Sequence, residues 1–489
     1  MIPFGQWNPD QAGINTKVCR TASNVVPAAI GFAPMFGPVA GTAALPAACM
    51  GAAVLLRSSG ATAAVAGTME GLFKLATDGT WTDVTRTVGG PYATPFGEMW
   101  RYAQWGDQVI ATNYIDDPQV FDFGSSTEFD ALAGTPPKAR YIDVVRDQVV
   151  MAGLYGYESR LQWSGTNDAT WWTVGSNNCD YQDFPSGGPI KGFLGGATGW
   201  VFQHSAITRM TQTPGAATIY QFDPVQGAKG LQAPHSLVRV GETMGQGDTA
   251  YYLASDGFHL MDLATGAVRP IGHQKWRKWF LSDMRPGSWL SVIGAADPLN
   301  PLILWCYISV NNNTQTPDRM VVYDRVLDEA TTADISVEAL ATWITSGVTL
   351  DTMDAFGSME TLPYSLDSPY WRGGTSIVGL FGTDHKLAHL LGGTLAATVE
   401  TSDGMMDARE LVSGIVPFVD SADATVALSC RERDADAVTY DDPAGLEDTG
   451  EAPAWNSGNL ARARIQVPAD SSWTYLKGLK TVTKRRGKR

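Results

Sequence analysis

Short runs of apolar and β-branched residues recur along most of the chain, each followed by a turn and a second short run. One copy is Gly106-Asp-Gln-Val-Ile-Ala-Thr-Asn113, which a turn connects to Pro118-Gln-Val-Phe-Asp-Phe123. Runs of this length that are rich in β-branched and aromatic residues predict β-strands, and turns with Gly and Asp predict hairpins. Seven copies occur, over residues 63–75, 106–123, 146–163, 199–210, 249–262, 302–323 and 376–391.

Most of these copies begin at intervals in the forties and low fifties of residues. A period of this size with hairpin content is typical of a β-propeller, whose blades are four-stranded sheets. A single blade cannot bury both of its faces, so radial packing of blades has to supply the core. We therefore predict a mainly β fold with a six- or seven-bladed β-propeller over residues 61–400. An insertion at about residues 327–370, rich in Asp, Glu, Ser and Thr, is expected to decorate one blade.

Residues 1–60 are predicted to form an extended Pro/Gly-rich N-terminal arm. The segment from Thr21 to Leu56 contains no charged residue, but four prolines and four glycines interrupt it. Helix breakers at that density exclude a membrane-spanning helix. We expect the arm to pack across a sheet or against a neighbouring subunit. The first nineteen residues contain neither a basic region nor an apolar core, so no secretory signal is expected.

The texture of the sequence changes after about residue 400. Alternating segments such as Thr425–Ser429 and Ala461–Val467 predict half-exposed strands. We predict a small β domain over residues 401–476, with an acidic loop from Asp434 to Glu451 between its strands, and a basic C-terminal tail over residues 477–489.

Composition narrows the function classes. The chain is 44% hydrophobic and 17% charged, which excludes a disordered acidic chain. Its net charge is −15, but the last thirteen residues carry seven bases and no acid, so the preceding residues carry −22. Because affinity for phosphates comes from clustered Lys and Arg, this balance argues against an ordinary nucleic-acid-binding protein.

The five cysteines are widely scattered and include no C-x-x-C pair. This pattern argues against a cysteine-based zinc site and against a disulfide framework. We expect five buried free thiols in a chain that is assembled in a reducing cytoplasm.

Few residue patterns point to catalysis. The sequence contains no phosphate-binding loop, no H-E-x-x-H zinc motif, no nucleophile elbow and no dinucleotide fingerprint. Thr77–Trp81 and Ser164–Trp171 are loosely similar to the Asp-box turns of sialidase-type propellers, but neither matches. We predict no enzymatic activity, no catalytic residues and no cofactor.

Two groups of residues are candidate metal sites. His385 and His389 are four residues apart, but they lie in a strand-like run, so we expect partly exposed strand residues there. Four aspartates could hold calcium, but the spacing of an EF-hand is absent, so we expect a solvated acidic loop. These aspartates are Asp434, Asp436, Asp441 and Asp442.

Several segments together resemble a family of phage virion proteins, the tail hub or nozzle proteins of short-tailed bacteriophages. The resemblance spans most of the chain, including the Pro-rich arm that ends near Cys49-Met-Gly-Ala52. The matching segments are residues 104–113, 118–123, 137–147, 162–165, 182–185, 195–203, 236–240 and 256–258, and 461–469 with Trp473.

This resemblance implies a structural role in the virion. A propeller-bearing subunit of that family forms a six-fold ring below the portal and its adaptor, extends the DNA channel and carries fibres, spikes or a plug. The implied partners are therefore further copies of the chain, the portal-adaptor protein, tail fibres, spikes or plug, and double-stranded DNA that passes without sequence-specific binding. The implied location is the phage tail, assembled in the host cytoplasm.

Charge fits such a channel, because an acidic wall repels phosphates. It equally fits a surface that is acidic for solubility alone. The basic tail has three open interpretations: a contact to acidic neighbours, a contact to DNA, or a frayed terminus. We prefer the first, with Lys484, Arg485, Arg486, Lys488 and Arg489 as candidate assembly contacts. The alternative function is a receptor-binding or glycan-degrading propeller at the tail tip, and a cellular propeller scaffold is a third hypothesis.

Overall fold

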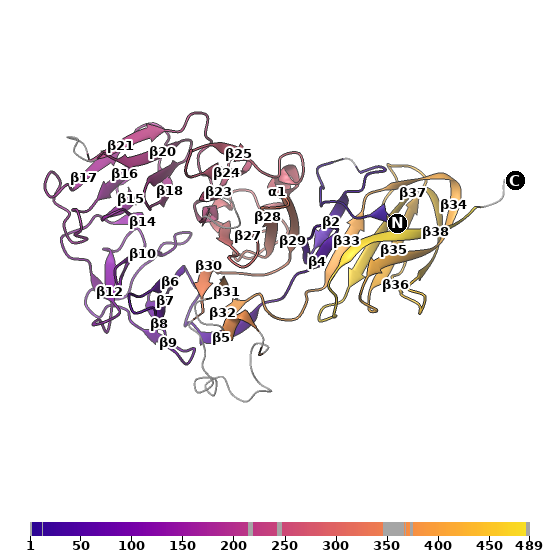
Figure 1. Ribbon diagram of the computed structural model, residues 1–489, viewed down its shortest axis with the longest axis horizontal. Helices are drawn as coiled ribbons and strands as arrows, with labels where there is room; N and C mark the ends of the chain where they lie inside the picture. Colours follow the sequence, from indigo (N-terminus) through magenta and orange to yellow (C-terminus); the bar gives the residue numbers. More distant parts are fainter. Residues whose placement is uncertain are drawn as a thin grey trace.

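The computed structural model describes residues 2–11, 13–213, 219–241, 247–345, 366, 368–371 and 375–485. Strands dominate these residues, and the helices are short (Figure 1). They are α1 (Arg277–Asp283) and three 3-10 turns, η1 (Pro234–Ser236), η2 (Trp289–Ser291) and η4 (Pro369–Trp371). The strands form a β-propeller, with a second β domain beside it.

Four-stranded antiparallel units are arranged in a ring, and Figure 1 looks into it. The first strand of each unit lies nearest the centre. Four of the units are β6 (Ala52–Leu56), β7 (Thr62–Gly67), β8 (Leu72–Leu75), β9 (Trp81–Asp83); β10 (Arg101–Trp105), β11 (Gln108–Thr112), β12 (Gln119–Asp122), β13 (Asp130–Ala131); β14 (Ala139–Val145), β15 (Gln148–Leu154), β16 (Tyr157–Trp163), β17 (Asp180–Asp183); and β18 (Ile190–Leu194), β19 (Gly199–Gln203), β20 (Ile207–Gln212), β21 (Tyr220–Pro224).

Three more four-stranded units complete the ring. Two of them are separate sheets, and the third is part of the sheet that continues into the second β domain. The separate sheets are β22 (Val238–Val240), β23 (Thr249–Ala254), β24 (Gly257–Asp262), β25 (Val268–Pro270); and β30 (Ala339–Ile344), β31 (Ser376–Phe381), β32 (Lys386–His389), β5 (Val39–Ala44). Between them lies the unit β26 (Ile293–Ala296), β27 (Leu302–Tyr307), β28 (Arg319–Asp324), β29 (Glu329–Ala333), which belongs to a larger sheet. The prediction of a mainly β fold with six or seven blades is confirmed.

The seven predicted hairpins are the middle two strands of the seven units, from β7–β8 to β31–β32. The second strand of a unit has neighbours on both faces, and β15, β19, β23 and β27 are buried along their whole length. A strand buried on both faces reads as a continuous apolar run, which is why these hairpins stand out in the sequence.

Aromatic side chains fill the spaces between blades. Between the third and fourth blades, Trp163 meets Tyr220 edge-on, with ring centroids 5.1 Å apart. Phe202 and Tyr252 meet in the same way between the fourth and fifth blades, with ring centroids 5.5 Å apart. Such pairs add packing specificity to the burial of apolar surface, and they tie each blade to its neighbours.

The N-terminal segment closes the ring. β5 is the outermost strand of the blade formed by β30, β31 and β32, and Ala40 pairs with Ala388 across this junction. Just after β5, the chain enters β6, the first strand of the first blade. The edge of β32 is thereby paired by a strand from the opposite end of the sequence, so the ring does not end in an open blade.

Three predicted boundaries differ from the strands that form. Within the predicted arm of residues 1–60, β5 and β6 are propeller strands. The predicted insertion at 327–370 contains β29 and β30, which are blade strands, and residues 346–365 lie outside the described residues. The predicted basic tail contains most of β38 (Leu476–Arg485). In each case strand pairing with distant segments organises residues whose local pattern is weak.

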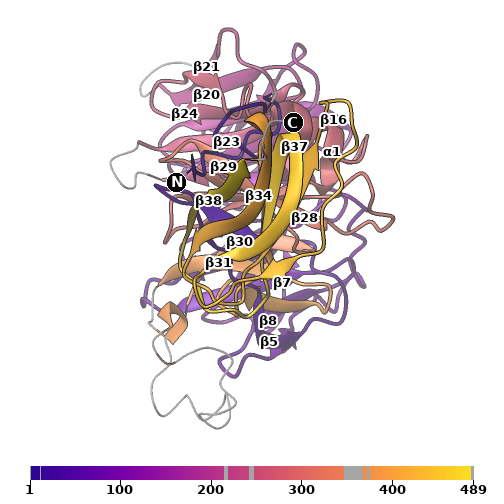
Figure 2. The same ribbon diagram turned by 90° about the vertical axis from the view of Figure 1, so that its right-hand side faces the viewer.

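The second β domain faces the viewer in Figure 2. Three of its strands are long: β34 (Gly404–Val419), β37 (Ala452–Val467) and β38. Shorter strands pair around them, so that the N-terminal arm and the C-terminal region share one sheet. These are β1 (Ile2–Pro3), β2 (Cys19–Ser23), β3 (Val25–Pro27), β4 (Phe32–Pro34), β33 (Ala397–Thr401), β35 (Thr425–Arg431) and β36 (Ala444–Gly445).

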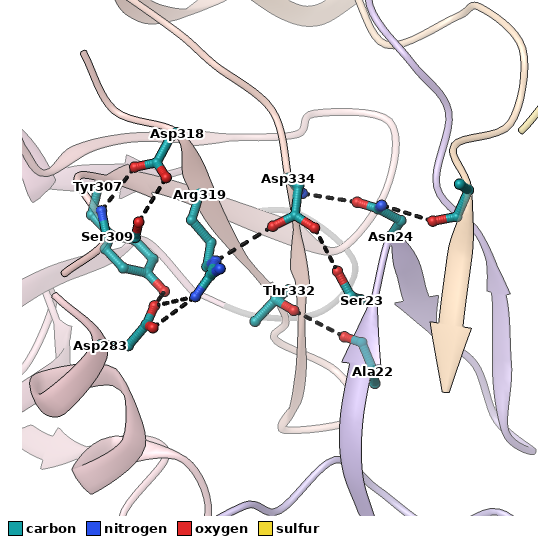
Figure 3. A network of polar contacts seen from close by, with 11 residues as sticks. Ala22, Ser23, Asn24, Asp283, Tyr307, Ser309, Asp318, Arg319, Thr332 and Asp334 are labelled. Carbon is teal, nitrogen blue, oxygen red and sulfur yellow. Dashed lines mark hydrogen bonds and ion pairs between the residues drawn. The ribbon is translucent and has the colours of Figure 1, made fainter. Parts of the chain in front are cut away.

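The propeller and this domain are joined by strand pairing. β2 pairs in parallel with β29 on one side and antiparallel with β33 on the other, so the sheet runs from a blade into the second domain. Side chains reinforce the junction (Figure 3). The Thr332 hydroxyl donates to the Ala22 carbonyl at 3.1 Å, and the Asp334 backbone N–H donates to Asn24 Oδ1 at 2.8 Å.

A polar network extends from this junction to α1 (Figure 3). Asp334 accepts from the Ser23 hydroxyl at 3.1 Å and from Arg319 Nε at 3.4 Å. Arg319 Nη1 also reaches both oxygens of Asp283 at 2.7 Å, and Tyr307 donates to the same carboxylate at 2.7 Å. A guanidinium held by two carboxylates has little freedom to reorient, so the network holds Asp334 in place to accept from Ser23 at the junction.

The second domain also contains a buried charge cluster. The Asp403 side chain is 1% exposed and lies 2.7 Å from Arg462, 2.8 Å from Arg431 and 3.7 Å from Arg20. Burial alone would raise the pKa of Asp403, but the guanidinium groups outweigh it, with Arg462 first, and hold that pKa below its usual value. Asp403 therefore connects strands from both ends of the chain.

We predict that truncation of residues 1–44 opens the ring, whereas truncation of residues 1–38 does not. Both variants lose β1–β4, but only the longer truncation removes β5, so their difference isolates the closing strand. Hydrogen exchange of the β32 amides is the measurement, because an unpaired edge loses protection. Equal exchange of β32 in the two variants would show that β5 does not close the ring.

We predict that Asp403→Asn lowers the free energy of unfolding by about 3–5 kcal/mol at pH 7, because it leaves buried guanidinium groups without their counter-charge. Since the folded-state pKa of Asp403 is lowered, its contribution is present above the ordinary carboxyl pKa and is lost as the pH falls through the folded value. Denaturant titrations at pH 7 and pH 2.5 should therefore show a smaller difference from the wild type in acid. The exposed Asp442→Asn is the control, and a pH-independent difference would contradict the argument.

Candidate functional site

The first strands of several blades begin around a cavity of about 320 Å³. We call this cavity the central mouth. Its lining comes mainly from segments that precede those strands, since Met50 precedes β6, Met99 precedes β10 and Glu338 precedes β30. Loops at the ends of blade strands are where propellers and other rigid β scaffolds present their functional groups. The central mouth is therefore the candidate functional site of the propeller.

His235 is fixed in the wall of the mouth. Arg101 Nη2 lies 2.6 Å from His235 Nδ1, and His235 Nε2 lies 2.9 Å from the Gly97 carbonyl. Because arginine can only donate, Nδ1 accepts and Nε2 carries the proton that it donates to Gly97. Burial, followed by the charge of Arg101, lowers the pKa of His235 to about 3. This imidazole is neutral and both of its nitrogens are occupied.

Glu98 is engaged by Arg140 on the neighbouring blade, with 2.8 Å between Glu98 Oε1 and Arg140 Nε. Arg140 also pairs with Glu158 at 3.2 Å and stacks on the ring of Tyr114 at 3.9 Å. Burial works against the charge of Arg140, but Glu98 and Glu158 outweigh it and raise its pKa. Tyr114 has a φ of +82°, which is uncommon for a bulky residue, so local backbone strain accompanies this stack.

Glu338 is the second carboxylate of the mouth. It accepts from the Cys49 backbone N–H at 3.0 Å and lies 2.8 Å from His385 Nδ1. It therefore connects the segment between β5 and β6 to the closing blade. Both carboxylates of the mouth therefore have structural partners: Glu98 bonds Arg140, and Glu338 bonds His385 and the Cys49 backbone.

The two histidines of the first candidate metal site do not face each other. His385 faces Glu338, whereas the buried His389 bonds the Val378 carbonyl through Nδ1 at 2.7 Å. Burial lowers the pKa of His389 to about 4. The expectation of partly exposed strand residues is therefore wrong for His389, because β32 lies inside the closing blade. In the described part of the chain, no three His, Cys, Asp or Glu side chains are grouped to hold a metal ion.

The four aspartates of the acidic loop have separate partners. Asp434 pairs with Arg431 at 3.0 Å, Asp436 accepts from the Arg433 backbone N–H at 2.8 Å, and Asp441 accepts from Asn456. Asp442 lines a shallow hollow beside Trp455. The structure does not bring their oxygens together around one point.

Two of the five candidate assembly contacts, Lys484 and Arg485, lie at the end of β38. Lys484 is exposed, pairs in register with Leu411 and places its ammonium 5.4 Å from the centre of the Trp455 ring. Arg485 pairs with Glu410 in the same register. Arg486, Lys488 and Arg489 lie outside the described residues. Trp455 itself is 71% exposed, so this corner offers an aromatic surface beside positive charge.

The five cysteines are free. Cys19, Cys49, Cys179 and Cys306 are buried as predicted, whereas Cys430 on β35 is half-buried and packs against the core of the second domain. Burial raises the pKa of Cys430 to about 11, followed by the effect of Asp441. Such thiols are inert as nucleophiles at neutral pH.

The residues of the mouth were not identified from the sequence. Glu98, Arg101 and His235 lie in or beside connecting segments whose pattern is neither strand-like nor motif-like. The available signal was positional, because the segment before each predicted hairpin has to lead back to the centre of a propeller.

No helix among the described residues combines the length and the apolarity that a membrane crossing requires.

Comparisons with known proteins add the fold alone. No family model matches the chain, and no curated protein matches it. Similar solved structures include the extracellular domain of a one-component system from B. thetaiotaomicron (10% identity, 86% of this chain, TM-score 0.41), YCF48 bound to a peptide (9%, 75%, 0.40) and the WD40 β-propeller domain of Doa1 (9%, 63%, 0.33). The alignments cover 47%, 99% and 90% of those chains, so this chain spans about half the length of the first. At these identities and TM-scores they say nothing about what this chain binds.

Proposed function

We propose that the chain is a structural subunit of the tail of a short-tailed bacteriophage. In this proposal, copies of the chain form a ring below the portal-adaptor protein that extends the DNA channel and anchors fibres, spikes or a plug. The resemblance of residues 104–123 and 461–469 to tail hub or nozzle proteins is the sequence argument for it.

The observation that carries the proposal is the fusion of the propeller to the second β domain. The sheet continues from β29 through β2 into β33, and the network around Arg319 and Asp334 locks this junction (Figure 3). Two parts that are held at one angle suit a subunit whose contacts must stay in register in a ring. A binding module on a flexible linker would need no such junction.

The central mouth supports a structural role over catalysis. Glycoside hydrolysis by the usual route needs two carboxylates that face a substrate across a gap. Here Glu98 is held by Arg140 of the neighbouring blade, Glu338 is held by His385 and the Cys49 backbone, and His235 uses both ring nitrogens internally. The net charge of −22 before residue 477 is of the sign that a surface along which DNA slips requires.

A second candidate function, a receptor-binding propeller at the tail tip, is favoured by one patch. Tyr155, Tyr157 and Tyr181 are 58%, 60% and 40% exposed on the third blade. The guanidinium of Arg160 lies between the last two rings, at 4.5 and 4.0 Å. Exposed aromatic side chains that gather around a cation are typical of a binding surface.

The proposal predicts that the purified chain sediments as a ring of six times 52.4 kDa and releases no sugar from host polysaccharide. Deletion of residues 486–489 should shift this population towards single subunits, because it removes three positive charges from the candidate contacts. Its unfolding transition should stay unchanged, since the deletion leaves β38 intact.

Sedimentation velocity and a reducing-sugar assay measure both properties on the same sample. The matched control removes three positive charges from the propeller (Lys138→Gln, Lys229→Gln, Lys386→Gln), away from β38. A monomer that hydrolyses the polysaccharide would contradict the proposal, and a trimer would favour the tail-tip alternative.

A further inference from the structure

A groove with a cavity volume of about 1120 Å³ adjoins the central mouth on the first blade. Ala48, Met50 and Met69 line both cavities, so the two lie next to each other. The groove is bounded by the segment between β5 and β6, by the turn between β7 and β8, and by residues 83–91. We call this hollow the blade-one groove.

Apolar side chains are exposed along the blade-one groove and the mouth. Phe96 is 76% exposed, Met69 47% and Leu290 44%, and all three line one or both cavities. Val88 is 83% exposed between the lining residues Thr87 and Gly90. Large apolar side chains that gather around a hollow mark an interaction site, and flexible methionines are common at surfaces that accept peptide side chains.

The charge of the groove is negative. Glu70, Asp83 and Glu128 line it, and none of the three forms an ion pair with another described residue. The one lining cation, Arg86, is already held by Asp116 at 2.7 Å and by the face of the Tyr92 ring at 4.5 Å. Three uncompensated carboxylates attract Lys and Arg side chains and repel phosphates, which excludes a nucleic acid as the occupant.

The wall between groove and mouth is rigid before any partner arrives. Thr68 and Gly71 bond each other in a tight turn, with the Gly71 N–H donating to the Thr68 hydroxyl at 3.0 Å. The buried Trp100 indole donates to the Thr68 carbonyl at 2.8 Å, and its ring lies against Gly67 with no room for a side chain there. A preformed wall lowers the entropic cost of binding an extended segment.

We infer that the blade-one groove and the central mouth together bind an extended segment of a partner protein. The segment presents apolar side chains to Met69, Phe96 and Leu290, and Lys or Arg side chains to Glu70, Asp83 and Glu128. This inference does not depend on the ring, because the site lies within one copy of the chain.

Three fluorescein-labelled ten-residue peptides test it by fluorescence anisotropy with the full chain. The first combines Thr, Leu and Lys, the second has Glu in place of Lys, and the third has Ser in place of Leu. Only the first should bind, and its affinity should fall at high salt because exposed charges are screened. Binding of the second or third peptide as tightly as the first, or no binding of the first, would overturn the inference.

Substitutions locate the binding. Replacing the three groove carboxylates together (Glu70→Gln, Asp83→Asn, Glu128→Gln) should weaken the first peptide about tenfold at low salt, since each exposed charge pair contributes a few tenths to about 1 kcal/mol. Phe96→Ser should weaken it as well. The matched control removes three exposed carboxylates of the second domain (Asp442→Asn, Glu447→Gln, Asp448→Asn) and should leave the affinity unchanged. An equal loss in the control would mean that net charge alone attracts the peptide and would overturn the site.

Discussion

Everything in this structure depends on pairing the first and last parts of the chain. A ring of blades is stable only when its ends meet, and here β5 supplies the strand that the closing blade lacks. The pairing joins residues near position 40 to residues near position 388. Bringing such distant segments together costs chain entropy, and the contacts of the other blades offset this cost once the ring has formed. The central mouth inherits this constraint, because Glu338, Cys49 and His385 are brought together by the same closure.

The N-terminal arm has a second task in the same stretch of chain. Before it reaches the closing blade, β2 extends the sheet of one blade into the second β domain, and Asp403 gathers arginines from both ends of the sequence. The propeller and the second domain therefore share one sheet, and hydrogen bonds across the β2–β29 junction reinforce it. A fixed angle is what an assembly subunit needs, and it agrees with the structural role proposed above.

The sequence predicted the fold where burial is two-sided. The second strand of each blade is almost wholly buried, as in β23 and β27, and its apolar run marks a hairpin in the sequence. Outer strands such as β13, with both residues exposed, have no such pattern. The sequence predicts an arm at β5 because small residues such as Ala40 and Gly41 have a low β-strand propensity, and its partner strand lies far away in sequence.

The candidate sites were harder to predict for the same reason. Lys484 was singled out by charge, which the sequence shows directly, but its place on a long strand follows from pairing with β34. The carboxylates of the blade-one groove are ordinary turn residues in the sequence. Their importance comes from the absence of an ion pair among the described residues, and only the arrangement of blades reveals this.

The most direct test of the proposed function is an electron-microscopy reconstruction of virions that contain this chain. The account predicts six-fold density for the chain in a ring directly below the portal-adaptor complex. Density for the chain at fibre tips, or in three-fold rather than six-fold positions, would contradict it.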